Sequence, residues 1–158
     1  MASLTHAQRD LVKEARRAVL ATIDPNGDPR LVPITFATDD EAAGLLLYSA
    51  LDEKPKSVAD PHDLARVRDI ERRPRVTVLI DRWSEDWSQL AWLRLLGSAR
   101  VLDGDGNDAA EHARAIALLR AKYVQYAGQA LERRPMIRME IDRVTGWSAT
   151  AESEMPWT

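Results

Sequence analysis

The stretch that decides the fold lies near the N-terminus, where residues 18–38 read AVLATIDPNGDPRLVPITFAT. Its first part, 18–24, is short and rich in β-branched residues, which is typical of a β-strand. Residues 25–29 are a strong turn signal, because Asn-Gly adopts the positive φ angles that tight hairpins need. Residues 30–38 follow as a second strand, in which Pro33 marks an edge or a bulge. The segment therefore predicts an antiparallel hairpin.

The rest of the chain continues the same pattern. Further strands are predicted at 45–50, 75–81, 90–103 and 136–147. Helices are predicted at 5–17, 60–72 and 108–126. Because hairpin connections dominate and few helices separate consecutive strands, we expect an antiparallel sheet that curls or closes into a barrel. The predicted fold class is mainly β, with six or so antiparallel strands and flanking helices.

Local signals mark where these elements begin and bend. Thr5 and Gln8 have the spacing of a helix capping box, and Asp60 precedes a proline at the start of the second helix. Asp108 resembles the cap of the third helix. Gly97 predicts a bulge within the long strand 90–103.

Length and composition bound the class of protein. The 158 residues fit one domain, 1–158, with a folded core at about 5–148. The absence of cysteine excludes disulfides, thiolate catalysis and cysteine-ligated metal sites, and a net charge of −3 argues against general nucleic-acid binding. The longest uncharged apolar stretch, 42–51, is about half a membrane span, and the N-terminus is charged where a signal peptide is apolar. We expect a cytoplasmic protein that binds neither nucleic acid nor membranes.

The common catalytic motifs are missing from the sequence. The three histidines are far apart and form no HxxxH or HExxH pattern, so no metal site is predicted. No GxSxG or SxxK motif supplies a nucleophile, and no complete GxGxxG motif supplies a dinucleotide site. The chemistry of an enzyme with this sequence would have to come from elsewhere, such as an organic cofactor.

A basic patch begins at Lys54-Pro-Lys56, between a predicted strand and a predicted helix. Residues 54–75 hold seven basic and four acidic side chains, a local net charge of +3 in a chain of net −3. Two lysines so close together in a loop can present their ammonium groups to a phosphate. The alternative is a solvated helix face, which is favoured for the helix arginines and remains equally open for the two lysines.

A second patch, residues 81–94, holds Trp83, Trp87 and Trp92, with Arg94 close by. Three tryptophans at this spacing favour an aromatic wall for a ring system or an anchor for a partner subunit. Ordinary core and hairpin packing is the alternative.

Taken in order, these features resemble the pyridoxamine-phosphate-oxidase-like flavin and deazaflavin oxidoreductases, most closely the actinobacterial group described as using the deazaflavin coenzyme F420. The similarity covers about 19–147. It rests on these stretches: 20–24 with 27–29, 31–36, 52–56, 74–81, 85–88, 92–94 with Gly97, 119–126 and 146–147. The resemblance implies an FMN-binding-like split β-barrel that works as a homodimer, with two cofactor sites at the interface.

The resemblance also implies roles for individual residues. Lys54 and Lys56 match the basic pair that grips the cofactor phosphate. Val32, Pro33 and Thr35 belong to the strand that matches the wall beside the tricyclic ring.

Two further pairs of residues match the family's site. Ser49 and Ala50 match the strand end near the polyol chain of the cofactor. Trp92 and Arg94 match a strand that reaches the site from the partner subunit.

Two departures from the family pattern concern the phosphate. Asp69 stands where the family usually has Asn, and an acidic side chain there would oppose an anionic cofactor if it faced the site. The region 58–60 lengthens the loop in comparison with plainer relatives.

The function that we predict from the sequence is hydride transfer between reduced coenzyme F420 and a small organic acceptor. An FMN-dependent oxidoreductase, or a non-catalytic binder of a flavin, haem or bilin, is the alternative. No catalytic residue is assigned, and the proton donor remains open among Ser49, Thr35, Tyr48 and a bound water. The acceptor itself cannot be read from the sequence.

Overall fold

The computed structural model describes residues 2–52 and 58–150. Its α-helices in this part of the chain are α1 (His6–Glu14), α2 (Ala65–Arg72) and α3 (Ala109–Lys122). The strands are β1 (Ala18–Ile23), β2 (Pro29–Ile34), β3 (Ala37–Asp39), β4 (Leu45–Ala50), β5 (Arg75–Arg82), β6 (Ala91–Leu102) and β7 (Met136–Ser148). Short 3-10 helices include η1 (Pro61–Asp63), η2 (Trp87–Gln89) and η4 (Val124–Gly128). The predicted mainly β architecture, with antiparallel strands and flanking helices, is confirmed.

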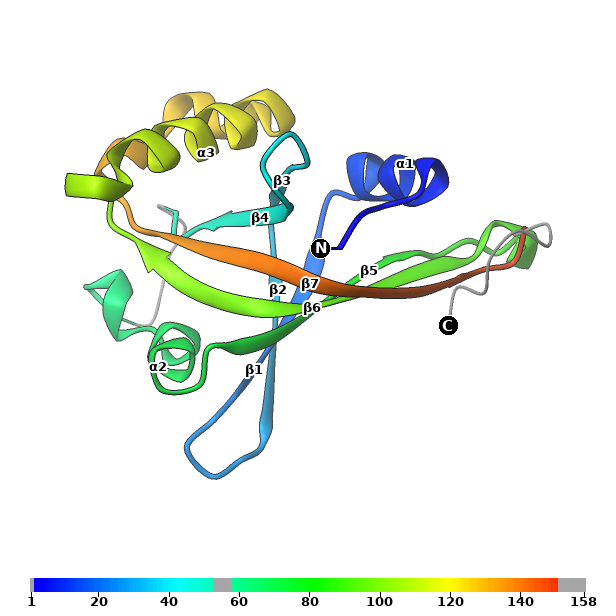
Figure 1. Cartoon of the computed structure of the whole chain (residues 1–158), viewed down its shortest axis with the longest axis horizontal. Coiled ribbons are helices and arrows are strands. Elements are labelled where there is room, and N and C mark those ends of the chain that lie inside the picture. Colours follow the sequence, from blue (N-terminus) through cyan, green and yellow to red (C-terminus); the bar gives the residue numbers. More distant parts are fainter. Residues whose placement is uncertain (1, 53–57, 151–158) are drawn as a thin grey trace.

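The sheet curls into a split barrel because its two edge strands are consecutive in the chain. The strand order β2-β1-β5-β6-β7-β4-β3 puts β2 and β3 at opposite edges, yet only residues 35–36 link them (Figure 1). In a flat sheet of seven strands the edges would lie roughly 29 Å apart, which is far beyond the reach of two residues. The short link therefore brings the edges together.

The predicted strand 30–38 is wrong in one respect. The chain leaves β2 after Ile34 and joins the opposite edge of the sheet at Ala37, where it pairs with Tyr48 of β4. Phe36 explains the break, because its side chain is fully buried and its N–H donates to the Tyr123 hydroxyl instead of to a strand. Pro33 lies in an edge strand, as its position in the sequence predicted.

The hairpin between β1 and β2 forms for local reasons. The carbonyl of Asp24 accepts the N–H of Gly27, whose φ of 89° suits glycine. The carboxylate of Asp24 accepts the N–H groups of Asn26 and Asp28. One aspartate therefore satisfies most of the polar groups in the turn.

The helices are shorter than predicted, although the first cap is confirmed. Thr5 and Gln8 form the expected capping box, but α1 ends at Glu14. The predicted helix 60–72 divides into η1, capped by Asp60, and α2.

The third predicted helix differs at both ends. Asp108 stands at the start of α3 but makes no side-chain cap, because its carboxylate pairs with Arg100. The α-helix stops at Lys122, and the chain continues to Gly128 as η4.

The hydrophobic core has two parts, one on each face of the curled sheet. The barrel interior is closed by α1 and α2 and includes Leu11, Leu20, Val67, Ile70, Val78, Leu93 and Met139. A smaller cluster fills the space between α3 and the sheet and includes Leu46, Tyr48, Ile116, Leu119 and Tyr126. No helix in the described part of the chain is long and apolar enough to cross a membrane.

Three strands extend beyond the rest of the sheet. β1 pairs with β5 only up to Leu79, and β4 pairs with β7 only up to Ile141. The remaining lengths of β5, β6 and β7 project as an arm away from α2 and α3 (Figure 1). Trp83 and Trp87 lie at the tip, in the connection from β5 to β6, and are 68% and 69% exposed.

The predicted bulge at Gly97 is confirmed, and it requires glycine. The register between β6 and β7 shifts between Leu96 and Gly97. A Cβ atom at Gly97 would lie 2.1 Å from the backbone oxygen of Glu140. Because both atoms belong to a central strand pair, the backbone would have to move to accept a side chain.

We therefore expect Gly97→Ala to lower the free energy of unfolding by more than about 2 kcal/mol. Urea denaturation followed by far-UV circular dichroism measures the change. Gly128→Ala is the matched control, because no atom lies within 4 Å of a Cβ there. Equal stability of the two variants would contradict this account of the bulge.

Candidate functional site

A pocket of about 470 Å³ opens at the corner where β2 passes to β3. Its lining residues are Arg16, Thr35, Tyr123, Gln125, Tyr126 and Gln129. The lining combines two aromatic rings with a hydroxyl, two amides and one guanidinium. This combination suits a planar ligand that carries polar groups at its edge.

Two tyrosines from the end of α3 hold this corner in place. The Tyr123 hydroxyl accepts from Phe36 N–H at 3.1 Å and donates to the carbonyl of Arg16 at 3.0 Å. The two rings meet edge to face with centroids 5.6 Å apart, and the guanidinium of Arg16 lies 4.6 Å from the centre of the Tyr123 ring. Tyr126 reaches Thr35, with 2.5 Å between the two hydroxyl oxygens. The walls of the pocket are thus fixed by side-chain contacts between elements.

Asp52 lies behind the pocket and is the last described residue before 53–57. The Tyr126 hydroxyl donates to its carboxylate at 2.7 Å, and the Asp52 side chain is buried. Arg134 donates to the carbonyls of Leu51 and Asp52, which fixes the backbone here. Lys54 and Lys56 lie outside the described residues, so the structure does not test their predicted role.

Arg66 of α2 is a half-buried cation whose charge interacts with Asp52. Its Nε atom is buried and has no hydrogen-bond partner among the residues that the structure describes. Burial lowers the pKa of Arg66, and the negative charge of Asp52 opposes this effect. A half-buried guanidinium with an unused, buried donor has capacity for an anionic ligand.

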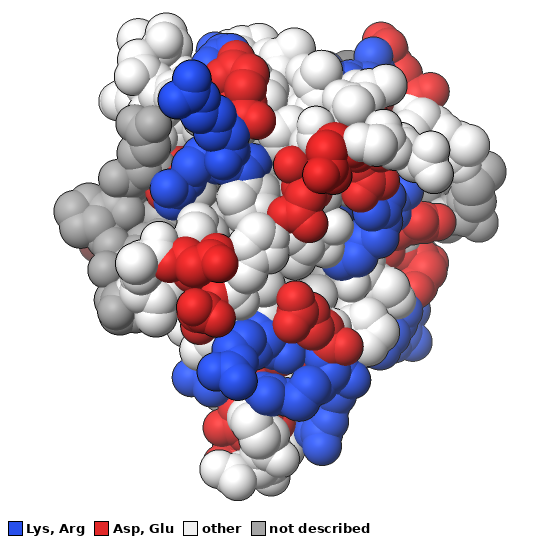
Figure 2. Space-filling view, turned by 90° about the vertical axis from the view of Figure 1, so that its left-hand side faces the viewer, with Lys and Arg blue, Asp and Glu red and all other residues white. Residues whose placement is uncertain are grey.

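A second pocket, the α2 groove, lies between α2 and the β1–β2 hairpin. It measures about 360 Å³, and its lining residues are Pro25, Arg30, Asp63, Ala65, Arg68, Asp69 and Arg72. Figure 2, which views the side of the molecule that carries α2, shows basic side chains gathered in the lower part of this face. The predicted basic patch is not a single surface, however, because Arg75 pairs with Asp142 of β7.

Asp69 forms the floor of the α2 groove, and its charge is neutralised. Its carboxylate accepts from Thr22 at 2.8 Å, from Arg30 at 2.8 Å and from Arg72 at 2.9 Å. Burial raises the pKa of Asp69, but the hydrogen bonds from Arg30 and Thr22 and the nearby positive charges outweigh burial and lower it. Asp69 therefore joins α2 to β1 and β2, and it does not present a free negative charge to a ligand.

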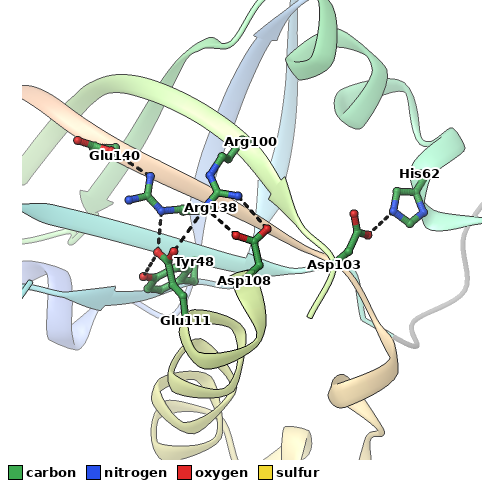
Figure 3. Close-up of polar contacts among 8 residues, drawn as sticks. All are labelled: Tyr48, His62, Arg100, Asp103, Asp108, Glu111, Arg138 and Glu140. Atoms are coloured by element: carbon green, nitrogen blue, oxygen red, sulfur yellow. Dashed lines mark hydrogen bonds and ion pairs between the residues drawn. The ribbon is translucent and has the colours of Figure 1, made fainter. Parts of the chain in front are cut away.

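A network of charged groups between α3 and the sheet surrounds Tyr48 (Figure 3). The Tyr48 hydroxyl donates to Glu111 at 2.7 Å, and Arg138 donates to the same carboxylate at 2.6 Å. Burial and the contact with Glu111 raise the pKa of Tyr48, which is completely buried. Of the possible proton donors, Tyr48 is thus bound to an internal partner, whereas Thr35 lines a pocket.

The histidines are held by partners within the chain. His62 bridges Asp60 and Asp103, at 2.8 and 2.5 Å, and these two hydrogen bonds raise the pKa of His62. Figure 3 shows the contact with Asp103. His112 is buried and contacts the carbonyl of Arg134 at 2.7 Å. Within residues 2–52 and 58–150, no group of three or more metal-binding side chains is arranged to hold an ion.

The other predicted residues occupy two environments. Ser49 and Ala50 are buried at the end of β4, where they pair with Ile137 and Met136. Val32 packs against the barrel core, whereas Pro33 is exposed. Their predicted contacts with a cofactor remain predictions.

Pro33, Trp92 and Arg94 share one face of the sheet. The register places Pro33 beside Val19, Val19 beside Leu79, and Leu79 beside Arg94. Three strand spacings, about 15 Å, therefore separate Pro33 from Arg94. The Arg94 guanidinium lies 5.6 Å from the centre of the Trp92 ring.

Sequence reasoning missed the residues that organise the corner pocket, namely Arg16, Asp52, Tyr123 and Tyr126. Tyr126 lies 91 positions from Thr35, so no local pattern connects them. The available signal was the pair of tyrosines three residues apart at the end of a predicted helix, inside the stretch 119–126 that contributes to the family resemblance.

Comparisons with known proteins identify the fold. Residues 4–148 match the sequence model of the family described as pyridoxamine 5'-phosphate oxidase. The structure is similar to that of a conserved hypothetical protein from Mycobacterium tuberculosis, with 18% identity over 94% of this chain and 87% of that chain, and a TM-score of 0.69. No curated protein matches the sequence significantly.

Two other similar structures come from proteins whose names state a ligand. An FAD-binding protein from Mesorhizobium loti has 19% identity over 90% of this chain and 94% of that chain, with a TM-score of 0.63. The haem storage protein of Vibrio cholerae has 16% identity over 93% of this chain and 95% of that chain, with a TM-score of 0.64. At these identities the similarity shows the fold alone.

The contacts of Asp69 lead to a prediction on stability and pH. Asp69→Asn removes a buried charge that binds two arginines. We expect it to lower the free energy of unfolding by roughly 1–3 kcal/mol at pH 7. The folded-state pKa of Asp69 lies below its ordinary value of 3.8, so its stabilising contribution is present above that pH and is lost as the pH falls through the lower value. The difference in the free energy of unfolding between wild type and variant should therefore be constant near neutrality and shrink below about pH 4.

Urea denaturation at a series of pH values measures this difference. Asp142→Asn is the matched control, because its pair with Arg75 is about half exposed and should contribute less than about 1 kcal/mol. A cost for Asp69→Asn no larger than that of the control would show that Asp69 does not anchor α2.

Proposed function

The chain belongs to the pyridoxamine 5'-phosphate oxidase family, and from this premise we propose that it is an oxidoreductase dependent on a flavin-type cofactor. Coenzyme F420 is the cofactor that we propose first. The reaction is hydride transfer between the reduced deazaflavin and a small organic acceptor. FMN is the alternative cofactor within the same class of enzyme.

The observation that carries this proposal is the corner pocket beside Thr35. Its two tyrosine rings and polar edge suit a planar ligand, and Thr35 belongs to the segment that the family resemblance matches to the ring wall. Asp52 lies behind the pocket, and Lys54 and Lys56 follow it in the chain. A ring site and a basic segment are therefore adjacent along the sequence, as a cofactor with a ring and a phosphate requires.

Charge supports the deazaflavin over FMN. FMN ends in one phosphate, whereas coenzyme F420 continues from its phosphate into a tail of carboxylates. Arg30, Arg68 and Arg72 line the α2 groove, and Arg66 has a buried donor without a partner in the described residues. Arg30 and Arg72 pair with Asp69. Arg66 and Arg68, together with the two lysines of the 54–56 segment, offer more positive charge than one phosphate needs.

In this proposal the cofactor, when bound, supplies the hydride chemistry, and the protein binds and orients it. Lys54 and Lys56 hold the phosphate, and Pro33 and Thr35 face the ring. The walls of the corner pocket exclude water from one side of the site. No side chain needs to act as a nucleophile, which agrees with the lack of nucleophile motifs in the sequence.

We further propose that the protein works as a homodimer and that a second copy of this chain covers the outer face of the sheet. This face carries Leu31, which is 65% exposed, and Leu79, which is 39% exposed. The arm adds three exposed tryptophans: Trp83, Trp87 and Trp147. Apolar and aromatic surface of this kind is enriched at the centre of protein interfaces.

Binding of haem without catalysis is a second candidate function, favoured by the similarity to a haem storage protein. The described histidines do not support it, because each has a partner within the chain. His6 pairs with Asp10, His62 with two aspartates, and His112 with a carbonyl. Ligation of haem by His62 would require one of its two contacts with aspartate to break.

Titration with each cofactor, followed by quenching of tryptophan fluorescence, tests the function. We expect the deazaflavin to bind with a low-micromolar dissociation constant and more tightly than FMN. Changing both Lys54 and Lys56 to Ala should weaken binding at least tenfold, about 1.4 kcal/mol, because the phosphate loses both ammonium groups.

The control for this double variant changes Lys13 and Arg17 to Ala, which removes the same charge from the N-terminal part of the sequence. Its affinity should equal that of the wild type. Unchanged affinity of the Lys54 and Lys56 variant would show that the phosphate binds elsewhere. Binding of haem, with no quenching by either flavin-type cofactor, would replace the proposed function by the second candidate.

Sedimentation at micromolar concentration tests the homodimer. We expect a particle of twice 17.7 kDa, and we expect Leu79→Lys to give a particle of 17.7 kDa because a charge would be buried in the interface. Val124→Lys is the control, since Val124 is 85% exposed and lies on η4. A wild-type particle of 17.7 kDa would refute the dimer.

A further inference from the structure

Three side chains form a line of hydrogen bonds from the protein interior to the corner pocket. The carboxylate of Asp52 is 2.7 Å from the Tyr126 hydroxyl, which is 2.5 Å from the Thr35 hydroxyl. Asp52 and Tyr126 are buried, and Thr35 lines the pocket. Tyr126 also lines the pocket, but its hydroxyl is already engaged by Asp52 and Thr35, so the Thr35 hydroxyl is the end of the line that faces a ligand.

The carboxylate fixes the direction of the hydrogen bonds. An ionised aspartate only accepts, so Tyr126 donates its single hydroxyl proton to Asp52. The Tyr126 oxygen can then only accept from Thr35, and the Thr35 proton is used in that bond. The free lone pairs of Thr35 remain for the pocket, so Thr35 faces a ligand as an acceptor.

The surroundings keep this direction stable. The positive charge of Arg66 interacts with Asp52 and favours its ionised form. Burial, together with the contact with Asp52, raises the pKa of Tyr126, so the phenol keeps its proton at neutral pH. The hydroxyl of Tyr123 donates to the carbonyl of Arg16, so it does not compete for Thr35.

We propose that Thr35 is a specificity-determining residue that selects ligands with an O–H or N–H donor at this end of the corner pocket. Tyr126 and Asp52 are positioning residues, which act through Thr35. The assignment rests on the proposed function only in taking this pocket as the ligand site. A ligand with only an acceptor at that position would face the Thr35 lone pairs and leave its own acceptor unpaired.

The test uses two probes of nearly the same shape and the protein without cofactor. p-Cresol carries an O–H donor, and 4-methylpyridine N-oxide carries an oxygen that only accepts. Dissociation constants are measured by nuclear magnetic resonance titration, with the shifts of Tyr123 and Tyr126 as reporters. We expect the wild type to bind p-cresol at least tenfold more tightly than the N-oxide, about 1.4 kcal/mol.

The variants test whether the line of hydrogen bonds sets this preference. Tyr126→Phe frees the Thr35 proton, so Thr35 can donate, and the ratio of the two constants should fall at least fivefold. Asp52→Asn offers an amide that can donate to Tyr126 and reverse the line, so it should move the ratio in the same direction. Tyr48→Phe is the matched control and should keep the wild-type ratio, because the Tyr48 hydroxyl also donates to a carboxylate, that of Glu111, but Tyr48 does not line the corner pocket.

If the role of Tyr126 were merely structural, Tyr126→Phe would weaken the binding of both probes equally and leave the ratio of their dissociation constants unchanged. The proposal is overturned if the wild type binds both probes equally, prefers the N-oxide, or binds neither at tens of millimolar. It is also overturned if Tyr126→Phe folds and keeps the ratio. Because no cofactor is present, these outcomes are independent of the flavin titrations, which test the proposed function by themselves.

Discussion

The two-residue link between β2 and β3 is the constraint on which the rest of the structure depends. Residues 35–36 hold the opposite edges of a seven-stranded sheet together, so the sheet must curl. The backbone at such a corner cannot satisfy its polar groups in a strand pair. Tyr123 supplies the missing partner for Phe36 N–H, and Tyr126 binds the Thr35 side chain. The corner pocket is therefore a consequence of the way in which the barrel closes.

Buried carboxylates connect the helices to the strands of this barrel. Asp69 of α2 binds Thr22 of β1 and Arg30 of β2. Asp39 at the end of β3 binds Arg114 of α3. Asp52, after β4, binds Tyr126 of η4. Asp69 and Asp39 each gain several donors in exchange for lost hydration, which is the condition for burying a charge. These contacts hold the two pockets in shape from within.

The sequence predicted the features that depend on neighbouring residues. The β1–β2 turn, the Thr5 capping box and the Gly97 bulge follow from local chemistry, and all three are present. The break at Phe36 and the contact of Tyr126 with Thr35 depend on residues about 90 positions away, which no local pattern connects. Asp69 could be recognised as a departure from the family pattern, but its neutral environment depends on Arg30, 39 positions away. Local reasoning therefore found the strands and the curled sheet, and missed the break at residues 35–36 that creates the pocket.

The proposed ligand site and the proposed dimer interface meet at the same strand. Thr35 lines the corner pocket, and Pro33, two residues earlier, belongs to the exposed face that carries Leu31, Leu79 and Arg94. A second copy on that face would exclude water from β2, and a ligand beside Thr35 would order the same strand. Whatever strengthens one of these contacts must strengthen the other by the same free energy, because linkage between two binding events is reciprocal. If the proposed dimer and the proposed ligand both order β2, the dimer would bind its ligand more tightly than a single chain does, and the ligand would stabilise the dimer by the same free energy.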